Sequence, residues 1–346
     1  MQVAVFGASG YTGLELLRIL LRHPRFELAV VTSEQRAGEP VGEAFPSLRG
    51  QLDLRFSASA EAASLAREVD LAFTALPHAA SAPTVAALRK AGVPVLDLSA
   101  DFRLHDAAVY QQWYGEHPAP GLLPSAVYGL PELHREALRK AELVAVPGCY
   151  PTSAILPLAP FLRKGLVETT GIVIDSKSGV SGAGRKLEAQ YLFAELDENC
   201  MAYKPGHEHR HTPEIEQEAS LVAGLPVRVT FVPHLLPTIR GIVTSVYLRP
   251  KQHLTTAQAR EVLARAYARE RFVRVLPVGA TPNLAAVRGT NFCDVAAVSD
   301  EGNGTLILLS ALDNLCKGAS GQAVQCANLM RGLPEEMGLL DTALLP

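Results

Sequence analysis

Short apolar runs alternate with segments of helical period in the N-terminal part of the chain. Gln2–Phe6 and Glu27–Thr32 have the character of buried strands. Thr12–His23, between them, has an amphipathic helical period that Pro24 ends. The pattern continues through strand-like Leu71–Thr74, Val95–Asp97 and Leu143–Val146, with a helical stretch at Ser81–Ala91. This alternation predicts an α/β architecture, a parallel and doubly wound sheet of Rossmann type with helices on both faces.

The pattern changes from about residue 170, where strand-like segments dominate. The main helical candidates there are Lys186–Leu196 and Thr255–Ala268, and a last helical stretch, Ala319–Arg331, carries small residues on one face that suit close packing on the first domain. We therefore expect a second domain of mixed, largely antiparallel α+β structure. Its predicted strands are Gly171–Asp175, Val227–Val232, Gly241–Leu248, Phe272–Val275, Phe292–Val298 and Thr305–Leu309.

Composition agrees with two well-filled globular domains. The 346 residues are 48% hydrophobic and 19% charged, with a net charge of −3. No basic excess favours nucleic acid as a partner, and no apolar run approaches the roughly 18 residues of a membrane span. The N-terminus lacks the features of a signal peptide. The cysteines are odd in number and include no CxxC pair, which favours a reducing compartment, so we expect a cytoplasmic protein. Because the net charge is small, we expect a small-molecule substrate. The cysteines are Cys149, Cys200, Cys293, Cys316 and Cys326.

A glycine-rich segment follows the first strand and opens the first helix. Its glycines permit a tight turn and close approach to a pyrophosphate, and the helix N-terminus supplies N–H donors. The spacing is GxxGxxG, and a glycine-rich turn without a ligand is the alternative. The predicted cofactor-binding residues here are Gly7, Ser9, Gly10, Tyr11, Thr12 and Gly13.

The end of the second strand favours NADP over NAD. Ser33 and Arg36 offer a hydroxyl and a guanidinium, which suit a 2′-phosphate. Glu34 could instead bond the ribose hydroxyl, which keeps NAD as the alternative.

Cys149 is the strongest candidate for a reactive residue. A buried strand ends in Pro147-Gly148, and Cys149 follows at a helix start, where the helix dipole favours the thiolate. This position predicts a covalent nucleophile, against the alternative of a small buried cysteine. For the other four cysteines we expect that buried, unreactive role.

A nucleophilic cysteine needs a base that is distant in sequence and close in space, and a histidine-rich segment is its natural source. His207, His209 and His211 would share one face of an extended segment, a spacing that could also hold zinc. No accompanying Cys or Asp cluster has ligand spacing, so we predict no metal. An inert surface cluster is a further alternative, and we expect His234 to be structural.

These segments together resemble the N-acetyl-γ-glutamyl-phosphate reductase family of arginine biosynthesis, including a relative that reduces carrier-protein-linked aminoadipyl phosphate in lysine biosynthesis. The resemblance runs almost from end to end. Its motifs are Gly7–Gly13, Leu96–Leu104, Tyr128–Glu132, Pro147–Thr152, Ser178–Arg185, His209–Glu214 and Asp313–Ala323.

The resemblance implies two domains of the semialdehyde-dehydrogenase type. Residues 1–148 with 312–346 would form the NADP-binding Rossmann domain. Residues 149–311 would form an α+β domain for catalysis and oligomerisation. It also implies that Cys149 is the nucleophile and His209 the acid/base, while Ser99 and Asn314 line the nicotinamide.

The predicted reaction replaces the phosphate of an acyl phosphate with the Cys149 sulfur and reduces the resulting thioester to an aldehyde. Anionic substrate groups need cationic or polar partners, and Arg103, on the loop after a strand, is the first choice for phosphate. Lys186 is also plausible, and Arg240 and Arg288 are weaker candidates for a carboxylate. The other predicted substrate residues are Ser178, Arg185 and His211.

Other substrates and other functions stay open on sequence alone. The acyl group could be aspartyl, or aminoadipyl held by a small acidic carrier protein. The chain could be a nucleotide sensor without catalysis, or a zinc hydrolase built on the histidines. We expect a homodimer or homotetramer, without nucleic-acid or membrane partners.

Overall fold

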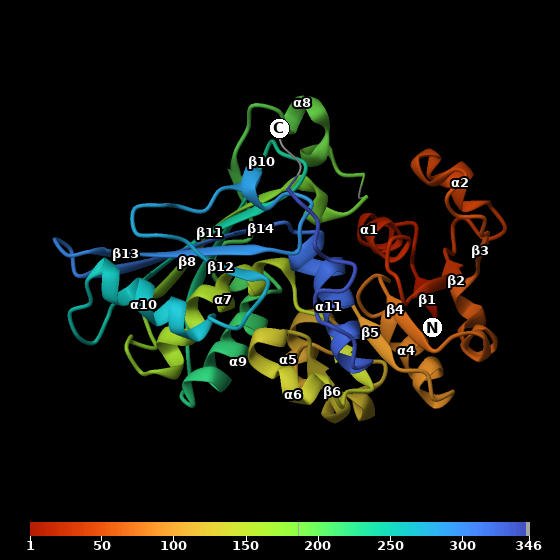
Figure 1. Cartoon of the computed structure of the whole chain (residues 1–346), viewed down its shortest axis with the longest axis horizontal. Coiled ribbons are helices and arrows are strands. Elements are labelled where there is room, and N and C mark those ends of the chain that lie inside the picture. The colour runs from red at the N-terminus through yellow and green to blue at the C-terminus, as the bar shows by residue number, and fades with distance from the viewer. Residues whose placement is uncertain (186, 344–346) are drawn as a thin grey trace. The chain divides into compact units, whose positions relative to one another are not determined.

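The computed structural model describes residues 1–185 and 187–343, and in it the chain folds as two compact units (Figure 1). The first comprises Met1–Pro147 and Ala319–Leu340. The second comprises Gly148–Gly318 with residues 341–343. No helix in the described part of the chain is long and apolar enough to cross a membrane.

The first unit is built on a parallel sheet in the order β3-β2-β1-β4-β5-β7-β6. The predicted α/β architecture is confirmed, because apolar strands such as β1 are buried on both faces. The strands are β1 (Gln2–Phe6), β2 (Glu27–Thr32), β3 (Phe56–Ser57), β4 (Leu71–Thr74), β5 (Val95–Asp97), β6 (Ala126–Tyr128) and β7 (Leu143–Ala145).

The helices of this unit include the short α2 and α3, which the apolar pattern did not predict. Helix α11 joins the unit from the far end of the chain, where the Ser320 hydroxyl donates to the Thr12 carbonyl at 2.9 Å. The helices are α1 (Tyr11–Leu20), α2 (Val41–Ala44), α3 (Ala62–Leu65), α4 (Ser81–Lys90), α5 (Ala107–Tyr114), α6 (Pro131–Leu138) and α11 (Gly321–Met330).

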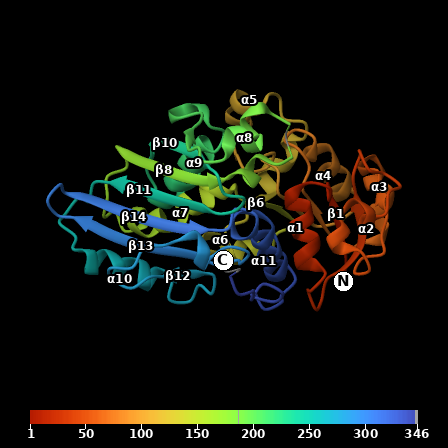
Figure 2. The same cartoon turned by 90° about the horizontal axis from the view of Figure 1, so that it is seen from above.

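The second unit is built on a mixed sheet in the order β12-β13-β14-β11-β8-β10-β9, of which Figure 2 shows the central strands side by side. Ile242 pairs with Ser178 on one side and with Leu312 on the other. The end of β8, the start of β11 and the end of β14 therefore lie at one edge of the sheet. The strands are β8 (Ile172–Gly179), β9 (Met201–Ala202), β10 (Val229–Leu236), β11 (Ile242–Leu248), β12 (Val273–Val275), β13 (Cys293–Asp300) and β14 (Thr305–Leu312).

Helices α7 (Cys149–Arg163), α9 (Thr212–Ala223) and α10 (Thr256–Ala266) cover one face of this sheet (Figure 1). The other face carries side chains that stay partly exposed, including Val173, Val243, Ile307 and Leu309. This second face mixes these aliphatic side chains with the charged Asp175 and Lys177.

In the second unit one predicted helix is wrong, and the observed helix α9 was not predicted. Within Lys186–Leu196 only α8 (Phe193–Leu196) and a 3₁₀ turn at Ala189–Tyr191 are helical, and Lys186 lies outside the described residues. Leu187, Leu192 and Phe193 are exposed and Leu196 is buried, so most apolar positions of this segment have no core to pack against. Helix α9, by contrast, buries Ile215 and Ala219, and Gly224 ends it in a left-handed conformation.

Candidate functional site

The glycine-rich loop of the first unit closes tightly at two of its three glycines. A Cβ on Gly7 would lie 2.6 Å from the Ala75 carbonyl oxygen, and Gly7 has a φ of 81°. A Cβ on Gly13 would lie 2.6 Å from the Ala8 Cα, whereas the nearest atom to one on Gly10 is 3.9 Å away. No side chain caps α1, so its first N–H groups remain available for an anion. The loop fits a pyrophosphate.

Beside this loop, the end of β2 favours a 2′-phosphate over a free ribose hydroxyl. The Glu34 carboxylate accepts the N–H groups of Ser59 and Ala60, at 2.5 and 3.2 Å, and so is committed to another part of the unit. Ser33 donates to the Ser9 hydroxyl at 2.9 Å. Arg36 is partly exposed and pairs with Glu39 at 2.9 Å, a surface contact worth little energy. A guanidinium is therefore available near the predicted phosphate position.

Cys149 is the first residue of α7, where the helix N-terminus stabilises a thiolate. Gly148 precedes it, and its N–H donates to the buried Glu214 carboxylate at 2.8 Å. Gly318 packs on the other side, where an added Cβ would lie 2.8 Å from the Cys149 Cβ. Cys149 is half-buried. The structure thus holds this cysteine between fixed main-chain segments and leaves part of it accessible.

The other cysteines follow the expectation in three of four cases. Cys293, Cys316 and Cys326 are buried, whereas Cys200 is exposed, so the expectation of a buried role is wrong for Cys200. This residue follows α8 in the segment whose apolar side chains lie at the surface.

The two histidines of the His209–Glu214 motif have different surroundings. The His209 ring lies among Tyr150, Tyr203 and Phe231, and its Nδ1 accepts the His211 N–H at 3.1 Å. Burial, reinforced by the charges of Lys204 and Arg210, lowers the pKa of His209 to about 4. His209 is therefore neutral at pH 7 and a weak proton acceptor.

The His211 ring lies beside Gly148, the residue before Cys149. A Cβ on Gly148 would lie 2.5 Å from the His211 Nε2, so the imidazole packs directly on the residue that precedes Cys149. His207 is exposed and lies 3.5 Å from Glu216. The described residues contain no group of three or more His, Cys, Asp or Glu that could hold a metal ion.

Two predicted ligands of the first unit are committed to its interior. Arg103 is 6% exposed and donates to the carbonyls of Val146 and Leu98, each at 2.8 Å. The buried Ser99 hydroxyl donates to Asp97 at 2.6 Å and accepts the Asp101 N–H at 3.0 Å. Burial raises the pKa of Asp97, although three hydroxyl donors act against this. The geometry gives Arg103 and Ser99 a part in shaping the loop after β5.

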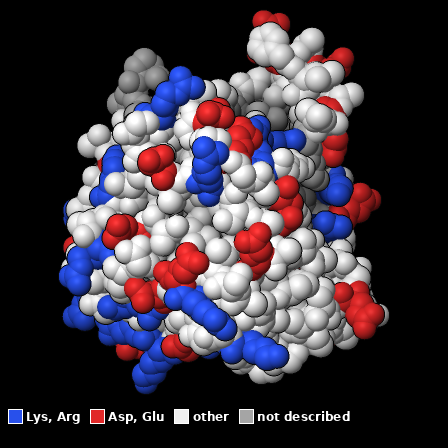
Figure 3. All heavy atoms as spheres, turned by 90° about the vertical axis from the view of Figure 1, so that its right-hand side faces the viewer, with Lys and Arg blue, Asp and Glu red and all other residues white. Residues whose placement is uncertain are grey.

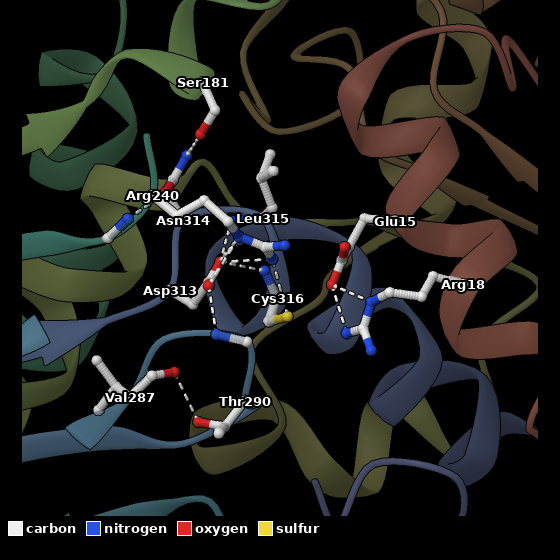
Figure 4. Close-up of polar contacts among 12 residues, drawn as sticks. Glu15, Arg18, Ser181, Arg240, Val287, Thr290, Asp313, Asn314, Leu315 and Cys316 are labelled. Atoms are coloured by element: carbon white, nitrogen blue, oxygen red, sulfur yellow. Dashed lines mark hydrogen bonds and ion pairs between the residues drawn. The ribbon is translucent and has the colours of Figure 1, made fainter. Parts of the chain in front are cut away.

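Of three further predicted residues in the second unit, Ser178 lies in β8, whereas Arg185 and Asn314 lie on loops. Arg185 is exposed, whereas Ser178 is buried and its hydroxyl donates to the Gly179 carbonyl at 3.0 Å. The Asn314 amide accepts the Gly241 N–H at 2.6 Å and donates to the Ser181 hydroxyl at 2.9 Å (Figure 4). Both ends of this amide are thus engaged within the unit.

Sequence reasoning missed Glu214, Asp313 and the tyrosine pair Tyr150–Tyr203. The two hydroxyls of the pair are 3.0 Å apart, and burial is the main cause that raises the pKa of both tyrosines. Glu214 and Asp313 lie within motifs that the sequence analysis quoted. The motifs marked the right segments, but the partner of each carboxylate comes from another part of the chain.

Charged side chains are interspersed on the surface shown in Figure 3. Lys and Arg alternate there with Asp and Glu, in keeping with the net charge of −3. This face therefore presents no continuous basic surface of the kind that nucleic-acid binding requires.

Comparisons with known proteins agree with the two-unit fold. Residues 2–141 match the model of the semialdehyde dehydrogenase NAD binding domain, and residues 149–314 match that of the semialdehyde dehydrogenase dimerisation domain. Among solved structures, aspartate semialdehyde dehydrogenase II of Vibrio cholerae superposes with a TM-score of 0.73 at 19% identity, covering 96% of this chain and 98% of that one. The NADP complex of the Candida albicans aspartate semialdehyde dehydrogenase gives 0.69 at 16% identity, covering 95% and 98%. The predicted fold class is confirmed.

Curated relatives are similar over the whole chain. N-acetyl-gamma-glutamyl-phosphate reductase of Geobacter sulfurreducens is 53% identical over 346 residues, covering all of both chains. The protein of the same name from Pelobacter propionicus is 51% identical over the same length, again covering all of both chains.

Proposed function

The chain belongs to the N-acetyl-γ-glutamyl-phosphate reductase family, and from this premise we propose that it reduces N-acetyl-γ-glutamyl phosphate to N-acetylglutamate semialdehyde and phosphate. The observation that carries the proposal is the setting of Cys149. This half-buried thiol lies at the N-terminus of α7, beside the Gly148–Glu214 hydrogen bond and the His211 ring. It has the features of a covalent nucleophile.

In the first step the Cys149 thiolate attacks the acyl carbon. The new C–S bond replaces the C–O bond to phosphate, which leaves with the bonding electron pair, and a thioester forms. When bound in the first unit, NADPH would supply the hydride that reduces the thioester carbon. Collapse of the tetrahedral product breaks the C–S bond, releases the aldehyde and returns the thiolate.

We assign the proton transfers of these steps to His211 in preference to His209. A general base works best with a pKa near the working pH, and that of His209 is lowered to about 4. The Nδ1 of His209 also accepts a main-chain N–H, which leaves its Nε2 as a donor. His211 packs against Gly148 and is therefore better placed to accept a proton from Cys149 and return one to the developing alkoxide.

NADP fits the first unit as its cofactor. Gly7 and Gly13 leave no room for a Cβ where the main chain turns toward the helix N-terminus, as a bound pyrophosphate requires. Glu34 is occupied elsewhere, so Ser33 and Arg36 are the groups that would hold the 2′-phosphate. Main-chain N–H groups of residues 10–13 would hold the pyrophosphate.

Arg185 is the predicted phosphate ligand that the geometry supports best, because its side chain is exposed. Arg103 and Ser178 are buried and make local hydrogen bonds, and both the oxygen and the nitrogen of the Asn314 amide are hydrogen-bonded. We propose that Arg185 binds the leaving phosphate, while the other three shape the surrounding loops.

We further propose that the enzyme is a homodimer and works in a reducing compartment. Residues 149–314 match a family model described as a dimerisation domain, and the partly exposed second face of its sheet offers a surface for a second copy. None of the five cysteines forms a disulfide, as expected for a cytoplasmic protein. The relatives described above are named for the N-acetyl-γ-glutamyl substrate and give no support to a carrier-linked one.

The test is phosphate-dependent reduction of NADP with N-acetylglutamate semialdehyde as the substrate. We expect activity in the native protein, its loss in Cys149→Ser, and its retention in the matched control Cys200→Ser, which changes an exposed cysteine. Equal activity in the Cys149 variant would contradict the proposed nucleophile. Inactive native protein whose Cys149 still reacts fast with iodoacetamide would move the proposal to a carrier-linked acyl group.

A further inference from the structure

The loop after β14, residues 313–318, carries an ion pair between a buried carboxylate and a partly exposed guanidinium, which the proposed chemistry does not use. Asp313 is fully buried, and Arg240 donates to it through Nη2 to Oδ1 and through Nε to Oδ2, each at 2.9 Å. The same carboxylate accepts main-chain N–H groups from Gly289 at 2.7 Å, Leu315 at 2.8 Å and Cys316 at 3.1 Å. Figure 4 shows Asp313 at the centre of this network, and its two oxygens thus fix the loop in one conformation.

This loop packs directly on Cys149. The Gly318 N–H donates to the Asp313 carbonyl at 2.9 Å. A Cβ on Gly318 would lie 2.8 Å from the Cys149 Cβ and 3.2 Å from its Cα, distances that leave no room for a methyl group. The position of the loop therefore sets the space in which the Cys149 side chain can turn.

Arg240 links the same loop to two others at that edge of the sheet. A Cβ on Gly179 would lie 2.8 Å from the Arg240 nitrogen, and the Gly179 N–H donates to the Gly241 carbonyl at 2.9 Å. Asn314 adds the third link through Gly241 and Ser181. The loops after β8, before β11 and after β14 are thus held together next to the nucleophile.

A buried ion pair is a poor choice for stability alone. The desolvation of two charges offsets most of their attraction, and apolar side chains of similar size often stabilise a protein as well. What apolar side chains do not provide is the directional, two-point geometry of a guanidinium on a carboxylate. The location of the pair, on the loop that touches Cys149, indicates a use for that geometry.

We propose that Asp313 and Arg240 are positioning residues for the Cys149 thiol. By fixing the loop they hold the Gly318 main chain against the Cys149 Cβ and restrict the sulfur to the orientation from which it attacks the acyl carbon. The proposal rests on the proposed function in so far as that function makes Cys149 the nucleophile.

The first experiment compares Asp313→Asn with the native enzyme. Asparagine keeps the shape but leaves the guanidinium without its counter-charge. We expect kcat to fall about 100-fold, the size expected when a reacting group is displaced by about 1 Å, with an unchanged KM for NADP. The rate at which iodoacetamide alkylates Cys149 should also fall across the pH profile.

Asp294→Asn is the matched control. Asp294 is a buried carboxylate of the same sheet and accepts the Arg274 guanidinium at 2.5 Å, but it lies in β13 instead of the loop at Cys149. We expect this variant to lose thermal stability while its kcat and alkylation profile stay native. An equal loss of kcat in both variants, or native values in Asp313→Asn, would overturn the proposal.

Two further variants keep the test decisive if Asp313→Asn does not fold. Arg240→Lys preserves the charge but not the two-point geometry, and Gly318→Ala pushes a methyl group toward Cys149 without touching the ion pair. Both should reduce alkylation of Cys149, and native rates in both would refute the proposal. Alkylation needs no substrate, so these results stand apart from any failure of the reductase assay.

Discussion

The two units differ in the groups that form their candidate sites, which are main-chain groups in the first unit and side chains in the second. In the first unit the groups suited to a phosphate are main-chain N–H groups of residues 10–13, shaped by glycines that have no room for a Cβ. In the second unit the groups proposed for catalysis and for its support are side chains: a thiol, an imidazole and the carboxylates of Glu214 and Asp313. A main-chain site is disrupted when a glycine gains a methyl group. A side-chain site is disrupted when a proton acceptor or a charge is removed.

The largest effect is expected in the second unit, at His211. His211→Asn should lower kcat by about 10²- to 10⁴-fold, the usual contribution of an acid/base residue, and leave the KM for NADP unchanged. Steady-state kinetics with His209→Asn as the matched control checks this. A larger loss of kcat at His209 than at His211 would restore His209 as the acid/base and contradict our assignment.

The next largest effect is expected in the first unit, at Gly13. Gly13→Ala would place a methyl group 2.6 Å from the Ala8 Cα. Overpacking of this kind costs about 1–3 kcal/mol, which corresponds to roughly 10- to 100-fold weaker NADP binding if the strain falls on the bound loop. Titration calorimetry with NADP measures it.

Gly10→Ala is the control for this prediction. Gly10 has a φ of −78°, and the nearest atom to an added Cβ is 3.9 Å away, so NADP affinity should stay within a few-fold of native. Equal losses in the two variants would show that glycine flexibility, and not the space around residue 13, determines cofactor binding.

The same contrast explains which features the sequence could predict. The loop at Gly7–Gly13 and the position of Cys149 depend on local order, a strand followed by a turn and a helix, and such order is visible in one chain. Arg103, Ser99 and Asn314 were assigned to ligands, but each is engaged by groups of its own unit. Those partners are brought together only by the fold, so a single sequence does not reveal them.

The sequence could not separate His209 from His211 for a related reason. The two residues are equivalent in sequence pattern, and only the packing of Tyr150, Tyr203 and Phe231 around His209 separates their chemistry. Likewise, the segment 187–196 has apolar residues at helical spacing, but its exposed position removes the reason to form a long helix.

A third prediction concerns the pH dependence of stability in the second unit. The folded pKa of His209, about 4, lies below its ordinary value of 6.5, so the unfolded chain binds the proton more tightly. The free energy of unfolding should therefore be highest above pH 6.5 and decrease as pH falls toward 4. Between pH 7 and pH 5 this one group should remove at most about 2 kcal/mol.

Urea unfolding of the native protein and of His209→Asn at both pH values isolates this effect. The variant should lose less stability than the native protein on acidification. His207→Asn is the control, because it removes an exposed imidazole from the same segment and leaves His209 in place. An identical slope in the native protein and in His209→Asn would show that His209 is protonated as easily in the folded state as in the unfolded one.

The smallest effect tests whether a side chain in the first unit sets specificity without affecting the chemistry. A guanidinium that contacts the 2′-phosphate contributes a charge-assisted hydrogen bond of about 1.5 kcal/mol, so Arg36→Ala should raise the KM for NADP about tenfold. The KM for NAD, which lacks that phosphate, and kcat with saturating NADP should stay native. Arg55→Ala is the control, since Arg55 bonds the nearby Gly38 carbonyl at 2.9 Å. A loss of kcat in Arg36→Ala would mean that this side chain also orients the nicotinamide, and the division between a main-chain site for binding and a side-chain site for catalysis would no longer hold.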